Sequence, residues 1–207
     1  MKKTSKTNKL ISVLTAMVTV FTFVTFALSN STLNASAHGF PDVKVEAHVQ
    51  NIGWLSPVYS GKMAGTTGRS LQLECLKLTI VDSDDYDGLI YMYTHQANIG
   101  WVDTSNALGQ NTAYRQNGSS EIGPIISGTV GETRAIEAVV IGLSGPIAGY
   151  YDIRYKVHVQ NLGWLDWKYN GQQAGTTGQG LRMEAIRVEL VPKGYRDEAI
   201  FRPKFSR

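Results

Sequence analysis

Two parts of the chain, within residues 45–80 and 155–190, carry the same alternation of hydrophobic and polar positions. From residue 155 to 160, hydrophobic side chains occupy every second position, which is the period of a β-strand with one buried face. From residue 181 to 190 the alternation returns, but its phase changes between Ala185 and Ile186. Residues 71–80 show the same pattern, with the change of phase between Cys75 and Leu76. Both stretches therefore predict strand pairs.

The change of phase predicts a specific irregularity. A slip of one residue inside a strand is what a β-bulge produces, so we expect bulges at Cys75-Leu76 and Ala185-Ile186, with Ala138-Val139 as a third instance. Glycine-rich runs and the Asn170-Gly171 pair between the strands are typical of turns. No stretch after residue 37 shows a helical period, and the pattern predicts an all-β protein.

The shared pattern reflects an internal repeat. Residues 45–80 and 155–190 align at a constant offset of 110, without a gap, with 16 identities in 36 positions. Residues 92–143 form a looser copy that begins with HQANIGW, where the others have HVQNIGW and HVQNLGW, and later has SGTVG in place of AGTTG. This middle copy carries 16 additional residues, which we place in an extended loop within residues 104–123 because that segment is rich in Asn, Gly, Gln and Ser.

Three such units can bury their hydrophobic faces on one another, and closure would also remove exposed sheet edges. We therefore expect residues 38–191 to form a single pseudo-threefold β domain, of either β-prism or β-trefoil type. Residues 192–207 are expected to form a basic C-terminal tail, which is interpreted as a solvated end of the chain.

The N-terminus differs in kind from the rest. Four lysines precede an uncharged apolar stretch from Leu10 to Leu28, and Ala35-Ser36-Ala37 follows, which is typical of a cleaved export signal over residues 1–37. An uncleaved membrane anchor is the alternative, because this stretch of 19 residues is long enough to span a bilayer. The full chain has 20 basic and 17 acidic residues, and without the signal 16 basic and 17 acidic residues remain. The mature chain is nearly neutral, so nucleic acid is not an expected partner.

The string shared by the copies has two interpretations. Trp54, Trp101 and Trp164 each follow a glycine, and we expect the rings to fill the core between repeats. Alternatively they are platforms on which a sugar ring stacks while its hydroxyls bond to the polar side chains Gln50, Asn51, Gln160 and Asn161. Outside the shared string, the less regular segments that follow it carry better candidates for exposed contacts: Trp167, Tyr169 and Tyr59.

A histidine and a glutamate recur together. His48, His95 and His158 are followed by Glu74, Glu137 and Glu184 on the later strand. We predict a buried or half-buried His–Glu pair within each repeat, because a paired charge can be buried where a lone one cannot. Three histidines around a metal ion at the pseudo-threefold axis are the competing arrangement.

The remaining chemistry is sparse. Cys75 is the single cysteine, so no intramolecular disulfide can form, and its apolar surroundings predict a buried, inert thiol. The acidic run 82–88 lacks the EF-hand spacing and is expected to be a hairpin loop. No nucleophile motif or distinctive carboxylate pair is present. The sequence predicts a protein that is not an enzyme and that needs no metal or cofactor.

The repeated string, the AGTTG runs and the Glu184-Ala185-Ile186 segment resemble the clostridial hydrophobic repeat with a conserved tryptophan (ChW repeat), in three copies. The resemblance implies a secreted or surface protein of clostridia and related Gram-positive bacteria, with adhesion or polysaccharide binding as the usual suggestion. We therefore expect a secreted, non-catalytic binding module for carbohydrate or another cell-surface polymer, with no membrane segment in its mature form. A structural or protein-interaction domain of the cell surface, with a cell-surface protein as partner, is the alternative.

Overall fold

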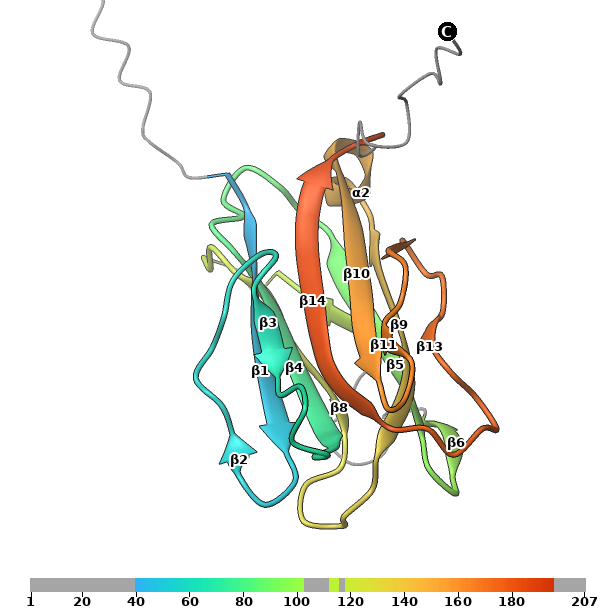
Figure 1. The fold of residues 1–207 in the computed structure, drawn as a ribbon. Coiled ribbons are helices and arrows are strands. Elements are labelled where there is room, and N and C mark those ends of the chain that lie inside the picture. Colours follow the sequence, from blue (N-terminus) through green and yellow to red (C-terminus); the bar gives the residue numbers. More distant parts are fainter. Residues whose placement is uncertain (1–39, 103–111, 116–117, 196–207) are drawn as a thin grey trace, which may run out of the picture. The chain divides into compact units, whose positions relative to one another are not determined.

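The computed structural model describes residues 40–102, 112–115 and 118–195. Their strands are β1 (Asp42–Val49), β2 (Gly53–Trp54), β3 (Met63–Gly65), β4 (Leu73–Val81), β5 (Leu89–Gln96), β6 (Gly100–Val102), β7 (Thr112–Tyr114), β8 (Ile122–Gly128), β9 (Ile136–Ser144), β10 (Tyr151–Val159), β11 (Gly163–Trp164), β12 (Lys168–Tyr169), β13 (Ala174–Gly175) and β14 (Met183–Pro192). One short helix, α2 (Ile147–Tyr150), precedes β10. The predicted all-β class is confirmed (Figure 1).

Three antiparallel sheets share one plan. In each, the first long strand of a repeat pairs with its last long strand, giving β1 with β4, β5 with β9, and β10 with β14. A short strand that contains the repeat tryptophan pairs with the other edge of the first strand. Because the middle repeat has all of these elements, the internal repeat is threefold in structure.

Each repeat also contributes a segment to the sheet of another repeat. The Ala-Gly strand β3 of the first repeat pairs with β14 of the third, β13 of the third pairs with β9 of the second, and β8 of the second pairs with β4 of the first. The exchange is cyclic, so every long C-terminal strand is covered on its outer edge by a neighbouring repeat. Figure 1 shows β3 lying between β1 and β14. Among the described residues, the strands form these three sheets and no closed barrel.

The β-bulges occur one residue earlier than the sequence predicts. His48 lies opposite Cys75 and Val49 opposite Leu73, so the extra residue is Glu74. The same irregularity falls on Glu137 in β9 and on Glu184 in β14. The bulged glutamate and both of its neighbours are buried. Because the glutamate is polar, the change of phase in the hydrophobic pattern becomes visible only at the residues that follow the bulge.

The bulge is also where the repeats meet. The carbonyl oxygen of Glu74 accepts a hydrogen bond from the N–H of Thr129 at 2.9 Å, and Glu137 and Glu184 accept equivalent bonds at 2.9 Å from Thr176 and Thr66. The glycine before each threonine packs against the same carbonyl. At Gly128, with φ of 121°, a Cβ would overlap the Glu74 oxygen, so only glycine fits.

The core lies under the inner faces of the three sheets. β1 alternates buried and half-buried residues along its whole length, and its valines point inward. The fully buried Tyr155 links two repeats: its hydroxyl accepts a hydrogen bond from the Ile141 N–H at 3.0 Å and donates one to the Gln172 carbonyl. Burial raises the pKa of this phenol, which keeps it neutral and able to donate.

Two expectations about the middle of the chain need correction. Part of the predicted loop within residues 104–123 is β7, which pairs with β5, and the strand β8 begins at Ile122; residues 103–111 and 116–117 lie outside the described residues. The sequence also gave no sign of α2, whose four residues are too few to establish a helical period.

Replacing Gly128 with alanine should destabilise the protein strongly. The new Cβ would overlap a backbone oxygen that is fixed by the bulge, and φ is positive there, so we expect a loss of about 2–3 kcal/mol in the free energy of unfolding. Gly131→Ala is the matched control, because Gly131 has φ of 80° but nothing within 4 Å of a built Cβ; it should cost about 1 kcal/mol. Equal losses in urea unfolding of the two variants would contradict the close contact.

Replacing Gln96 with valine should stabilise the protein. Gln96 is fully buried, and its side-chain amide has no hydrogen-bond partner among the described residues. The equivalent positions in the other repeats are Val49 and Val159, both buried. Removing an unsatisfied amide should raise the free energy of unfolding by about 1–3 kcal/mol. A lower urea midpoint for Gln96→Val would show that the amide is satisfied in solution.

Candidate functional site

The shared string forms a tight hairpin at the end of the first strand of each repeat. In the first repeat, the Ile52 N–H donates to the Val49 carbonyl at 3.1 Å, and Asn51 takes a φ of 60°. Asn98 and Asn161 have φ values of 69° and 64°. Asparagine is one of the few residues that tolerate this left-handed conformation in a turn, so the turn itself explains Asn51 and Asn161 without a ligand.

The predicted His–Glu pairs are present in all three repeats. The distances from Nδ1 to the carboxylate are 3.1 Å for His48 and Glu74, 3.0 Å for His95 and Glu137, and 3.2 Å for His158 and Glu184. The three Nδ1 atoms are buried and have no hydrogen-bond partner of good geometry among the described residues, and each contact is an ion pair when the imidazole is protonated. The pair joins the first strand of a repeat to the bulge in its last strand.

The tryptophans are on the surface, which corrects the expectation that they fill the core. Trp54 and Trp101 are each 43% exposed, and Trp164 is half-buried. Each lies opposite the repeat histidine in the register, on the outward side of its sheet. The histidine ring meets the indole edge-on, with centroids 5.5–5.6 Å apart. The register places each tryptophan outside, because directly opposed residues of paired strands share a face and the face of the histidine is the outer one.

The chemistry around the tryptophans differs between repeats. Lys77 lies 5.5 Å from the centroid of Trp54, and Arg187 and Lys156 lie 5.2 and 5.6 Å from that of Trp164. In the middle repeat, Val140 occupies the position of Lys77 and Arg187. Cation–π contacts of this kind hold both the ring and the cation in place.

The other predicted contact residues are distributed over the outer surface. Trp167 is half-buried, with Arg154 at 4.4 Å and Lys156 at 4.8 Å from its centroid. Tyr169 is half-buried in β12, and Tyr59 is 47% exposed. Gln50 and Gln160 are half-buried beside the turn asparagines. The structure therefore brings Trp167 next to Trp164 and its cations, and it leaves Tyr59 in another repeat.

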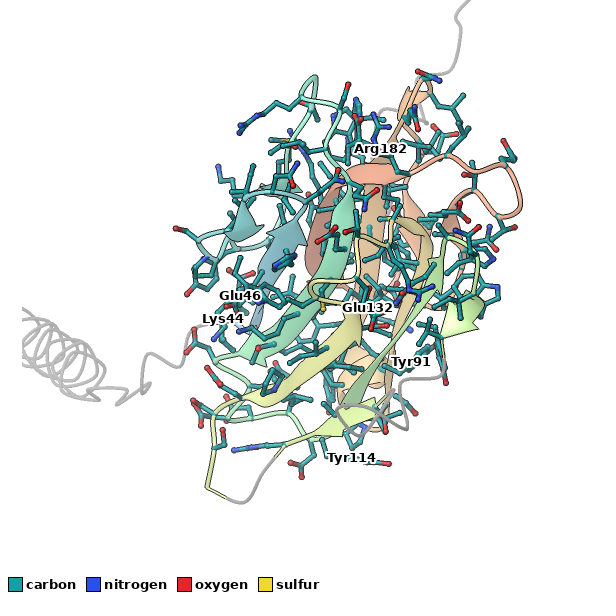
Figure 2. The ribbon with its side chains drawn as sticks, turned by 90° about the horizontal axis from the view of Figure 1, so that it is seen from below. Lys44, Glu46, Tyr91, Tyr114, Glu132 and Arg182 are labelled. Carbon is teal, nitrogen blue, oxygen red and sulfur yellow. The ribbon has the colours of Figure 1, made fainter. Side chains whose placement is uncertain are left out.

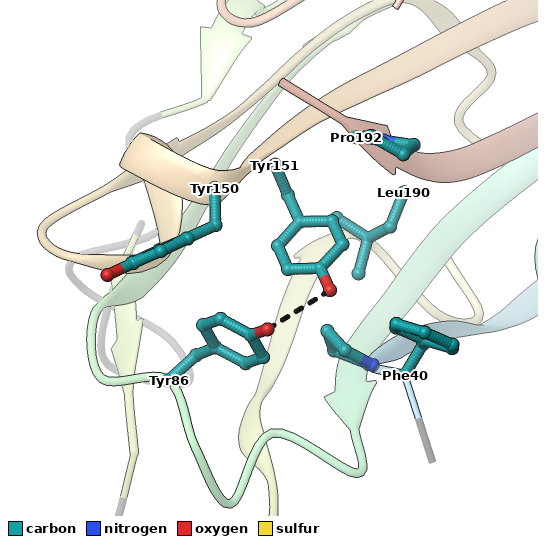
Figure 3. Close-up of a pocket in the computed structure, with 7 residues that line it drawn as sticks. Phe40, Tyr86, Tyr150, Tyr151, Leu190 and Pro192 are labelled. Atoms are coloured by element: carbon teal, nitrogen blue, oxygen red, sulfur yellow. Dashed lines mark hydrogen bonds between the residues drawn. The ribbon is translucent and has the colours of Figure 1, made fainter.

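A tyrosine-lined cavity was missed by the sequence reasoning. It has a volume of about 430 Å³ and is lined by Tyr86, Tyr150, Tyr151, Phe40 and three other residues (Figure 3). The Tyr151 hydroxyl donates to that of Tyr86 at 3.4 Å. Burial and the neighbouring Tyr86 raise the pKa of Tyr151 to about 12. The sequence feature that could have indicated this cavity is the Tyr150-Tyr151 pair, which has no counterpart in the other copies.

The remaining candidates behave as structural features. Cys75 is buried, and burial raises the pKa of its thiol to about 11. The acidic run 82–88 is held by Arg115, which donates to the Asp84 carbonyl at 2.7 Å. The repeat histidines lie on three separate sheets, and no three His, Cys, Asp or Glu side chains in the described part of the chain are grouped to hold a metal ion.

The predicted export signal over residues 1–37 lies outside the described residues, as does the predicted tail after Tyr195. Within the described ranges, no helix is long and apolar enough to cross a membrane.

The fold and site define an all-β protein of three repeats, each with a surface tryptophan over a His–Glu pair. The family model Clostridial hydrophobic W matches two of these segments, residues 48–82 and 158–192. It therefore matches the first and third repeats, and not the middle one. No curated protein and no solved structure shows significant similarity to the chain.

The surface position of the tryptophans predicts a small effect on stability. Trp54→Ala removes one edge-on ring contact and one cation–π contact, so the free energy of unfolding should fall by about 1–2 kcal/mol. Leu78→Ala in the same repeat removes a fully buried side chain and should cost about 2–5 kcal/mol. A larger loss for Trp54→Ala than for Leu78→Ala in urea unfolding would place the tryptophan in the core.

Proposed function

We propose that the protein is a secreted, non-catalytic module that binds polysaccharide at a cell surface, with its repeat tryptophans as stacking platforms. The observation that carries the proposal is the position of Trp54, Trp101 and Trp164 on the outer surface instead of in the core. A large aromatic ring on the surface has a cost in water, and a sugar ring whose C–H face covers it relieves that cost.

The platforms are preorganised. A buried glutamate fixes the histidine, and the histidine ring fixes the edge of the indole. Holding a side chain in its bound orientation reduces the entropy that binding must offset. The arrangement occurs three times, so a polymer with repeating units could contact more than one platform, and linked weak contacts strengthen each other.

A protein-interaction domain without a small ligand is the second candidate. It is favoured by a different observation, namely that the hairpin tips expose one apolar residue in each repeat: Ile52 at 40%, Ile99 at 52% and Leu162 at 50%. Exposed aliphatic side chains suit a protein surface better than a sugar, because they offer no hydrogen bonds to hydroxyls.

Two finer points belong to the same proposal. The cyclic exchange between three sheets, with no closed barrel among the described strands, supports a β-prism over a β-trefoil. The middle repeat has the same strands, bulge and His–Glu pair as its neighbours, which supports its origin as a diverged ChW repeat.

Polysaccharide binding is tested with the mature chain on a glycan array and in pull-downs with insoluble polysaccharides. The triple variant Trp54→Ala, Trp101→Ala and Trp164→Ala should bind at least about tenfold more weakly, since stacking contacts of this size contribute roughly 1 kcal/mol each. Tyr150→Ala is the matched control, because it removes an exposed aromatic ring from the tyrosine cavity. Loss of binding in Tyr150→Ala alone would move the site to that cavity.

The two candidate functions give opposite results on cells. Binding that is lost when glycans are removed, and that survives protease treatment of the cells, supports the polysaccharide function. Binding that survives glycan removal, is abolished by protease treatment and is weakened by Ile52→Ser, Ile99→Ser and Leu162→Ser supports the protein-interaction domain.

A further inference from the structure

Two residues that face each other across the first and last long strands carry different side chains in each repeat. On the outward face beneath the repeat tryptophan, Glu46 lies opposite Lys77 in the first repeat, and their side chains form an ion pair of 2.7 Å. Figure 2 shows Glu46 beside Lys44 on β1. In the middle repeat the pair is Tyr93 and Val140. In the third repeat it is Lys156 and Arg187, two cations directly opposite each other.

The cation pair is unbalanced. Residues directly opposite each other on neighbouring strands have Cβ atoms about 5 Å apart, and like charges on such a pair repel. No carboxylate of the described residues lies within ion-pair distance of Lys156 or Arg187. The acidic side chains that flank Arg187 along β14 are engaged elsewhere: Glu184 with His158 and Arg182, and Glu189 with Arg154. The Arg187 guanidinium donates through Nη1 to the Gly61 carbonyl at 3.4 Å, and its buried Nε has no hydrogen-bond partner among the described residues.

Aromatic rings enclose this pair from two sides. Trp164 has both Lys156 and Arg187 against its ring, and Trp167 has Lys156 on one side and Arg154 as a second cation. The first repeat has Pro57 where the third has Trp167. Among the described residues, the second aromatic wall and the cation pair therefore occur together only in the third repeat. Cation–π contacts orient the two cations but leave their charge unneutralised.

We propose that the third repeat binds an oxyanion of an acidic polysaccharide, such as a carboxylate or a phosphate, at Lys156 and Arg187, with the attached sugar ring against Trp164 or Trp167. The proposal rests on the polysaccharide function and names the substrate class. Arginine and lysine donate charge-assisted hydrogen bonds to such oxyanions. The bound anion would supply the negative charge that Glu46 supplies in the first repeat.

The sharpest test transfers the first repeat's solution into the third. Lys156→Glu recreates the Glu46–Lys77 arrangement opposite Arg187, so the variant should fold and should be at least as stable as the parent in thermal unfolding. Its binding to polygalacturonate should fall at least about tenfold, since a charge-assisted contact is replaced by a repelling carboxylate. Arg69→Glu makes the same change of charge on the exposed loop between β3 and β4, and it should retain binding.

The choice of polymers separates charge from stacking. Fully methyl-esterified polygalacturonate has the same backbone without the carboxylates, and it should bind parent and Lys156→Glu equally. A glycerol-phosphate polymer distinguishes phosphate from carboxylate, and tighter binding to either one supports the proposal. Tighter binding to single-stranded DNA than to both polymers would overturn it, as would equal loss of polygalacturonate binding in Arg69→Glu.

Failure of this inference is distinguishable from failure of the proposed function. If Lys156→Glu leaves polygalacturonate binding intact while the triple tryptophan variant loses neutral polysaccharides, the oxyanion site is refuted and the stacking function stands. If the parent chain binds neither charged nor neutral polysaccharide, both are refuted.

Discussion

The structure depends on one bulged glutamate in each repeat. At Glu74, Glu137 and Glu184 the carboxylate meets the histidine of the same repeat, while the backbone carbonyl accepts the threonine N–H of the next repeat. A buried carboxylate without a partner would cost several kcal/mol. Because the bulge buries the glutamate, the histidine opposite it supplies a partner. The neighbouring glycine follows too, because no Cβ fits against that carbonyl. One irregularity therefore joins strands within a repeat and repeats to each other.

This arrangement separates the two faces of each sheet. The inner faces meet in one apolar core, and the exchanged segments β3, β8 and β13 cover the outer edges of the long C-terminal strands. The outer faces carry the His–Glu pairs, the edge-on ring contacts and the cation–π contacts, and the apolar core does not depend on them. Trp54 and Trp101 can remain half in water there, since the stability of the domain comes from the valines, leucines and isoleucines on the opposite face.

Much of this could be read from the sequence, and the failures have physical causes. Alternation predicted the long strands, and the spacing of His48 and Glu74 predicted their contact. The bulge was placed one residue late because the buried glutamate does not look hydrophobic. The tryptophans were assigned to the core because composition cannot tell a surface indole from a buried one. The cyclic exchange joins distant segments such as Gly65 and Ala185, and no local pattern records that pairing.

The repeats agree at positions that the fold constrains and differ at positions that it does not constrain. The features that the repeats share have structural reasons. They include the alternation from Val45 to Val49, the bulged glutamate and the glycine that packs against its carbonyl. Position 46 and its equivalents 93 and 156 do not, because Glu46, Tyr93 and Lys156 all point outward from the same strand register. The fold accepts an ion pair, a neutral pair and two cations at this pair of positions, so it does not determine which side chains occupy them. Differences between repeats at such positions are therefore the better guide to ligands.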